Sequence, residues 1–141
     1  MVGEPRQLLE IRERQSEAIA RTGIPHKFDV PLPIGVLGGF TEVVGSLLPV
    51  GATVYVFGHL GDGNLHVNVV GPDADDSRVD DSVLEAVARF GGSVSAEHGI
   101  GRAKVPYLHL SRSQTEIEAM RAVKRALDPA GIMNPGVIFP A

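Results

Sequence analysis

Two short segments of this chain hold the residues that could carry out chemistry. Residues 58–68 (GHLGDGNLHVN) and 91–101 (GGSVSAEHGIG) place three histidines, a glutamate and two asparagines among closely spaced glycines. Imidazole nitrogens and carboxylate oxygens are ligands of zinc and of similar divalent ions. A further histidine beside such a carboxylate is a candidate proton acceptor. The two segments therefore predict a metal site with an acid–base residue.

The first segment predicts a β-hairpin that brings two histidines together. If the Asp-Gly pair at 62–63 forms a two-residue turn, His59 lies opposite His66. Directly opposed residues have Cβ atoms about 4.5–5.5 Å apart, so the two imidazoles could share one metal. Alternation places Asn64 and Asn68 on the face of His66. The prediction depends on register, because a longer loop would shift the pairing by one residue and separate the rings.

The second segment would supply Glu97 as a third ligand. Three protein ligands leave positions open for water or substrate, as in a catalytic rather than a structural metal site. Such a metal can polarise the hydroxyl and carboxylate oxygens of a substrate. His98 is expected to point away from Glu97, and the adjacent Gly99 would let its ring reach a substrate hydroxyl.

Simpler interpretations of the same residues stay open at this point. A histidine at a strand end is often hydrogen-bonded to backbone, Glu97 could be an ordinary loop carboxylate, and Asp62 could be a turn residue. The glycines fit ordinary turns, and no G-x-G-x-x-G dinucleotide fingerprint is present.

Composition narrows the class of protein. The 141 residues, 43% of them apolar, suit one folded domain spanning residues 1–141. The absence of cysteine excludes disulfides and thiolate metal sites, and a net charge of −4 without a basic run argues against nucleic acid. Six glycines and Pro49 interrupt the least charged stretch, residues 33–60, so it is not a membrane span. With no apolar region of a signal peptide near the N-terminus, we expect a soluble, cytoplasmic protein.

Hydrophobic periodicity predicts an α+β fold, a small antiparallel sheet with helices packed on one face. Expected strands are 27–30, 53–59, 65–70 and a short one at 93–95; expected helices are 5–21, 34–48, 80–90 and 113–127. Ser113 and Glu116 match a capping box at the start of the last helix.

Three stretches resemble the C-terminal part of FAD-linked oxidases of the vanillyl-alcohol oxidase type: GHLGDGNLHVN, SAEHGIGRAK and ALDPAGIMNPG. The branch they resemble holds D-2-hydroxyglutarate dehydrogenases, D-lactate dehydrogenases and the glycolate oxidase D subunit. The resemblance runs from RERQSEAI at residues 12–19 to the end of the chain. It implies a ferredoxin-like C-terminal portion of a substrate-binding cap, which works with an FAD-binding domain or subunit. Nothing in these residues resembles that FAD-binding domain.

The resemblance also implies roles for individual residues. His59, His66 and Glu97 match metal ligands, usually of zinc, and His98 matches the base that takes the hydroxyl proton while a hydride passes to FAD. Asn68 and Lys27 match polar contacts to the substrate.

Two more residues match positions that hold a distal carboxylate of the substrate in the hydroxyglutarate branch. Arg12 stands at an arginine position, and Ser16 stands where that branch has a threonine. Four residues apart, they would share one helix face, and an arginine fork can hold a carboxylate at two points. A surface charge remains the alternative for Arg12, and serine in place of threonine leaves the substrate open among hydroxyglutarate, lactate and glycolate.

We therefore expect the cap portion of a flavin-dependent D-2-hydroxy-acid dehydrogenase, inactive as a redox enzyme in isolation. The alternative is a non-catalytic metal-binding or assembly module that pairs with a separate flavoprotein subunit. A stand-alone metal-dependent hydrolase is a third alternative, although the chain lacks a H-E-x-x-H helix. A cap without its partner domain would expose apolar surface, which leaves a homo-oligomer open.

Overall fold

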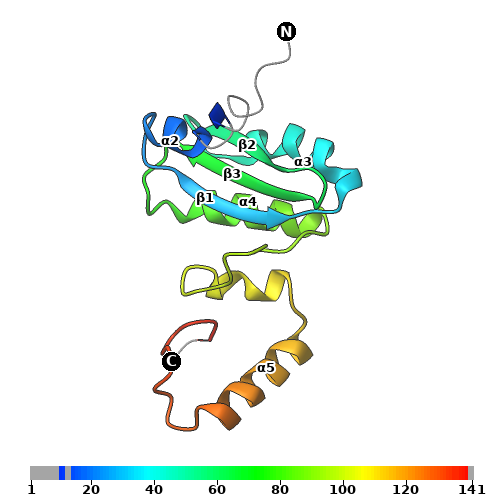
Figure 1. Cartoon of the computed structure of the whole chain (residues 1–141), viewed down its shortest axis with the longest axis vertical. Coiled ribbons are helices and arrows are strands. Elements are labelled where there is room, and N and C mark those ends of the chain that lie inside the picture. Colours follow the sequence, from blue (N-terminus) through cyan, green and yellow to red (C-terminus); the bar gives the residue numbers. More distant parts are fainter. Residues whose placement is uncertain (1–9, 12–13, 140–141) are drawn as a thin grey trace.

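The computed structural model describes residues 10–11 and 14–139, and it shows an α+β fold (Figure 1). Three antiparallel strands form one sheet in the order β1-β3-β2. The strands are β1 (His26–Pro31), β2 (Thr53–His59) and β3 (Asn64–Val70). All three agree with the predicted strands to within one residue. Strand β2 is a run of β-branched and aromatic residues, and in β1 and β3 apolar residues alternate with polar ones.

Side chains of β3 divide the sheet into an apolar and a polar face. Leu65, Val67 and Val69 are buried in the hydrophobic core, whereas Asn64, His66 and Asn68 point to the opposite face. On the apolar face the core continues through Phe28 and Val30 of β1. The predicted histidine-bearing face is therefore the one that the main core leaves uncovered.

Two helices cover the apolar face, as predicted. Helix α3 (Leu37–Val44) contributes Phe40 and Val44, and helix α4 (Ser77–Arg89) contributes a row of buried valines and Leu84. Phe40 packs edge-on against Phe90 just after α4, with ring centroids 5.7 Å apart. The predicted helix 34–48 is divided into α3 and two short 3₁₀ helices, η1 (Ile34–Val36) and η2 (Gly45–Leu47).

Helix α4 begins three residues before the predicted 80–90 helix. Asp76 is its N-cap and accepts a hydrogen bond from the backbone N–H of Arg78 at 3.1 Å. The acidic residues at 80 and 81 thus lie inside the first turns and not at the start of the helix.

The first predicted helix is seen as α2 (Gln15–Ala20). Its residue Ile19 is buried, and Gln15, Ala18, Ile19 and Thr22 line a hollow of about 550 Å³ together with residues 54–57 of β2. Most of the rest of the predicted 5–21 helix, including Arg12, lies outside the described residues.

The expected strand at 93–95 is not formed, but its backbone still pairs with the outer edge of β1. The N–H of Ser93 donates to the carbonyl of Pro31 at 3.1 Å, and the N–H of Ala96 donates to the carbonyl of Asp29 at 3.1 Å. The segment therefore runs antiparallel to β1, but with only these two backbone hydrogen bonds it does not form a regular strand. The residues that follow, Glu97 and His98, lie beside Asp29 on the polar face of the sheet.

The C-terminal part leaves the sheet. The 3₁₀ helix η3 (Val105–Leu110) leads to α5 (Gln114–Leu127), which Figure 1 shows in orange, clear of the sheet. The predicted capping box is confirmed: Ser113 Oγ accepts from the N–H of Glu116, and Glu116 Oε2 accepts from the N–H of Ser113. The tail returns to the loop after His98, where the N–H of Ile138 donates to the carbonyl of Gly101 at 3.1 Å. Within the described ranges, no helix is long and apolar enough to cross a membrane.

Candidate functional site

The hairpin that carries the two histidines has a different register from the predicted one. His59 pairs with Asn64, and His66 pairs with Phe57, so the loop contains the four residues 60–63 instead of two. Gly63 closes this loop with a φ of +71°, and its carbonyl accepts the backbone N–H of Leu32 at 2.9 Å. A Cβ at Gly63 would lie 2.1 Å from the carbonyl oxygen of Leu32. The loop is therefore shaped by contact with the chain after β1, which a local turn rule does not consider.

The two histidines nevertheless remain neighbours. The register differs from the predicted one by two residues, and because the side-chain period of a strand is two, both imidazoles stay on the same face. The rings of His59 and His66 lie edge to face with centroids 5.5 Å apart. The prediction that they share the polar face is confirmed, although their direct pairing was wrong.

A buried carboxylate lies beside this pair. Asp29 sits opposite His66 in the β1–β3 ladder and is 1% exposed. Its Oδ1 lies 3.4 Å from His66 Nδ1, and its Oδ2 accepts the backbone N–H of Glu97 at 2.9 Å. Asp29 thus joins the hairpin to the second motif.

Glu97 and His98 complete the cluster at the exposed side. One donor atom each from Asp29, Glu97 and His98 lies within 4.8 Å of the other two, a spacing at which three ligands can hold one ion. In the described part of the chain this is the one set of three such donors, and it differs from the predicted set of His59, His66 and Glu97. The expectation that His98 points away from Glu97 is wrong, since the two side chains approach the same carboxylate.

The charges of the cluster influence Asp29 and a nearby lysine. Burial raises the pKa of Asp29, but the N–H of Glu97, the side chain of Asn64 and the charge and N–H of His98 together bring it below the usual value. Burial lowers the pKa of the half-buried Lys104, and the negative charge of Asp29 partly opposes that change. Asp29 is therefore ionised at neutral pH, and its negative charge acts on both His98 and Lys104.

Two oxygen atoms of the site fit a cation. Asp29 Oδ1 and Asn64 Oδ1 are both buried, and neither has a hydrogen-bond partner. A buried acceptor without a partner is costly, whereas a divalent ion accepts oxygen and imidazole ligands together. Among the described residues, the donor atoms of Asp29, Glu97 and His98 thus fit a divalent metal, with the His59–His66 pair beside them through the contact of His66 with Asp29.

The predicted substrate-binding residues occupy different surroundings. Lys27 is exposed and pairs in the β1–β3 ladder with Asn68, which is buried at 4% exposure on the polar face. Ser16 is exposed on α2, one residue along the helix from Gln15. Arg12 lies outside the described residues, so its proposed partnership with Ser16 stays a prediction.

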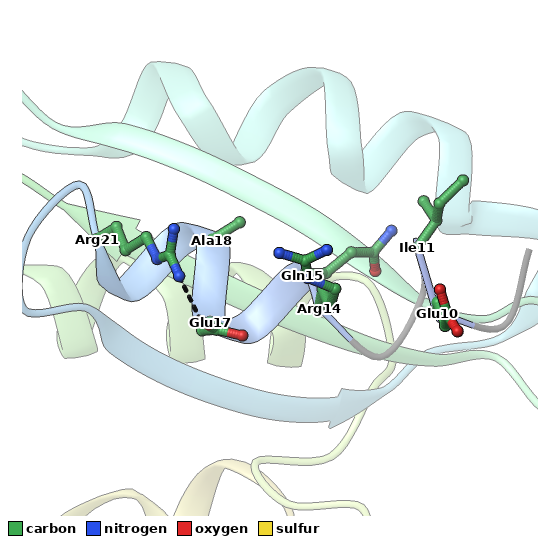
Figure 2. A pocket seen from close by; sticks show the side chains of 7 residues that line it. All are labelled: Glu10, Ile11, Arg14, Gln15, Glu17, Ala18 and Arg21. Atoms are coloured by element: carbon green, nitrogen blue, oxygen red, sulfur yellow. Dashed lines mark hydrogen bonds and ion pairs between the residues drawn. The ribbon is translucent and has the colours of Figure 1, made fainter. Parts of the chain in front are cut away.

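One hollow of the described surface lies away from the histidines. It has a volume of about 640 Å³ and runs along α2 and the residues before it (Figure 2). Its lining contains Arg14 and Arg21 but no histidine, and Arg21 Nη2 donates to Glu17 Oε1 at 2.6 Å. One of the two guanidinium groups is thus already neutralised, and the hollow lacks the donor set of the cluster around Asp29.

Asp29 is the residue that the sequence reasoning missed. The signal was present in the strand HKFDVP, where alternation places residue 29 on the same face as Lys27. A carboxylate between Phe28 and Val30, both buried, has to be held by specific partners.

Similarity of the sequence to known protein families and proteins shows the family to which this chain belongs. Residues 3–138 match the family model described as FAD linked oxidases, C-terminal domain. A protein of Stutzerimonas stutzeri named D-2-hydroxyglutarate dehydrogenase is 44% identical over 95% of this chain and 31% of its own length. A mitochondrial D-2-hydroxyglutarate dehydrogenase of Bos taurus is 40% identical over 94% of this chain and 25% of its own length. The chain thus spans less than a third of these relatives, and it belongs to the family of FAD-linked oxidase C-terminal domains.

Proposed function

We propose that this chain is the substrate- and metal-binding cap portion of a flavin-dependent enzyme that oxidises a D-2-hydroxy acid to the 2-oxo acid. One observation carries the proposal: the histidine hairpin and the Glu97–His98 segment meet around Asp29 on the polar face of the sheet. Family membership and the names of the relatives support the reaction class, with D-2-hydroxyglutarate as the first substrate to assay.

When bound, a flavin and a divalent metal would supply the hydride acceptor and the polarisation of the substrate oxygens. His59, His66 and Glu97 would hold the metal, probed first as zinc. Other residues of this chain would bind and orient the substrate. Lys27 is a cation on the exposed edge of the polar face, suited to a substrate carboxylate, and the neighbouring Asn68 would orient the substrate through its amide. Arg12 and Ser16 would bind a distal carboxylate if the substrate is a diacid.

His98 would remove the proton of the substrate hydroxyl at a ring nitrogen. It is exposed at the mouth of the cluster, where a substrate can reach it, and the carboxylate of Asp29 attracts the positive charge that the ring gains. A positioned base of this kind contributes a factor of about 10² to 10⁴ to the rate.

Titration of zinc into the 141-residue chain by calorimetry tests the metal part of the proposal. We expect one-to-one binding that is lost in the His59→Ala/His66→Ala double variant. His109→Ala is the matched control, because His109 is exposed and its Nδ1 lies 2.8 Å from the carbonyl of Pro106. Equal binding by the double variant and the parent would contradict the assignment of the ligands.

A chimera tests the catalytic part. This chain would replace the matching segment of the Stutzerimonas stutzeri relative, and oxidation of D-2-hydroxyglutarate and D-lactate would be compared. His98→Ala in the chimera should lower kcat far more than it changes KM. An unchanged kcat would remove His98 from the reaction. The purified 141-residue chain should be colourless, and stoichiometric FAD on it would contradict the division of roles.

Exposed apolar residues favour a partner for the C-terminal part. Val123, Leu127, Ile132 and Met133 are each more than half exposed on α5 and the segment after it. Such a surface suits the FAD-binding domain. It equally suits the alternative, a non-catalytic module that assembles with a separate flavoprotein subunit, and the effect of His98→Ala on kcat distinguishes these two functions.

A further inference from the structure

Asp29 is not in the proposed ligand set of His59, His66 and Glu97, and it is not one of the proposed substrate contacts. It lies in the middle of β1, is 1% exposed, and contacts both motifs of the site. Its two oxygens are used differently: Oδ2 accepts the backbone N–H of Glu97 at 2.9 Å, whereas Oδ1 has no hydrogen bond of standard geometry, although Asn64 and His98 stabilise the charge of the carboxylate. The side chain thus has one bond already made and one acceptor still available.

The available acceptor faces a ring nitrogen of His66. His66 Nδ1 lies 3.4 Å from Asp29 Oδ1, longer than a well-formed N–H···O bond of about 2.7–3.2 Å. A proton on Nδ1 would satisfy this buried oxygen, and the ring would then present its unprotonated Nε2 to a metal. Metal-binding histidines generally have their second nitrogen held in this way by a carboxylate or carbonyl.

The bond already made acts on the other motif. The N–H of Glu97 donates to Asp29 Oδ2 at 2.9 Å, and the main-chain carbonyl of Asp29 accepts the N–H of Ala96 at 3.1 Å. Two successive residues of the loop are therefore fixed by one residue of β1. The exposed side chains of Glu97 and His98 depend on this attachment for their place.

We infer that Asp29 is the positioning residue of the site: it fixes His66 as the Nδ1–H tautomer and holds the Glu97–His98 segment in reach of the hairpin. The inference rests on the proposed function for its consequence in metal binding. It does not rest on it for the tautomer and the loop attachment, because both can be measured in the metal-free chain.

Asp29→Asn is the decisive substitution. It keeps the size of the side chain, but an amide has one acceptor oxygen, so it can satisfy either the N–H of Glu97 or Nδ1–H of His66 and not both in their present places. We expect the zinc dissociation constant to rise by roughly 10- to 100-fold, the range typical for loss of such an outer partner. Asp62→Asn, an exposed carboxylate in the hairpin loop, is the control and should bind zinc as the parent does.

Two measurements on the metal-free chain separate positioning from a merely structural role. The ¹⁵N shifts of the imidazole should show His66 protonated at Nδ1 in the parent, and hydrogen exchange should show protection of the Glu97 amide. In Asp29→Asn at least one of these signatures should be lost while circular dichroism stays unchanged. If the variant fails to fold, the parent alone decides, because His66 protonated at Nε2 would overturn the inference.

The outcomes distinguish this inference from the proposed function. If the parent binds no zinc, the metal part of the proposed function fails, and the tautomer and amide exchange still decide the role of Asp29. If the parent binds zinc and Asp29→Asn binds it equally with both signatures intact, the metal site stands and the inference is overturned.

Discussion

Replacement of Gly58 by alanine should break the histidine hairpin, because the neighbouring strand leaves no room for a side chain at this position. Gly58 of β2 pairs with Leu65 of β3, immediately before His59. An added Cβ would lie 2.1 Å from the carbonyl oxygen of Asn64 and 2.9 Å from the Cα of Leu65. Both atoms belong to the backbone, so no side-chain rotation can relieve the contact.

The size of the effect follows from that distance. Real Cβ atoms hardly ever approach a neighbour closer than 3.0 Å, so the strands must separate by roughly 0.9 Å at Gly58, or the pairing must slip. Overpacking of a core by small groups costs about 1–3 kcal/mol, and a contact with rigid backbone belongs at the upper end. For a chain of this length about 3 kcal/mol corresponds to a fall in Tm of roughly 6–12 °C.

Urea unfolding followed by circular dichroism measures this loss, and Gly61→Ala is its matched control. Gly61 lies in the same loop motif without positive φ, and a Cβ there would meet nothing within 4 Å. Alanine at this position should be neutral or stabilise the fold by up to about 1 kcal/mol, because it restricts the unfolded chain. The two substitutions therefore have opposite expected signs. Equal stability of Gly58→Ala and Gly61→Ala would refute the packing argument and the hairpin register on which it depends.

Three further predictions concern other parts of the fold. Ser113→Ala should cost about 1 kcal/mol, read as faster amide exchange in the first turn of α5, because the capping box is lost; unchanged exchange would contradict it. Burial and the hydrogen bond to Asp81 at 2.8 Å raise the pKa of Tyr107, so absorbance at high pH should show a tyrosine ionising late, and Tyr107→Phe should remove that step. The hydrogen bond from Lys124 holds the pKa of Asp128 below its usual value, so the contribution of Asp128 is present above about pH 4 and is lost as the pH falls through its folded pKa. Amides 132–133, which donate to Asp128, should then lose protection, and Asp128→Asn should remove this pH dependence.

Local patterns predicted the regular elements well. The strands follow from runs such as TVYVFGH, and the capping box of α5 follows from Ser113 and Glu116, since each of these signals lies within a few residues. The face shared by His59 and His66 was also predictable, because an even error in register leaves the face unchanged.

The parts that could not be predicted depend on distant contacts. The loop 60–63 is longer than its Asp-Gly pair suggested because Gly63 also bonds to Leu32. The segment at 93–96 makes backbone hydrogen bonds to the edge of β1 without forming a strand. These contacts to a distant strand cannot be read from a local pattern of three residues. The role of Asp29 is invisible locally, because its partners, His66 and Glu97, lie far along the chain.

The bond between Asp29 and the Glu97 amide also bears on how the protein folds. The two residues are 68 positions apart, and β1 must already be paired with β3 before Asp29 faces either motif. Contacts of such long sequence separation form only after the entropy of closing the intervening chain has been overcome, which makes them slow. We therefore expect the candidate site to be among the last parts of the molecule to assemble, and a chain that has collapsed without correct strand order would have no site. Metal binding by this chain would report completed folding rather than guide it.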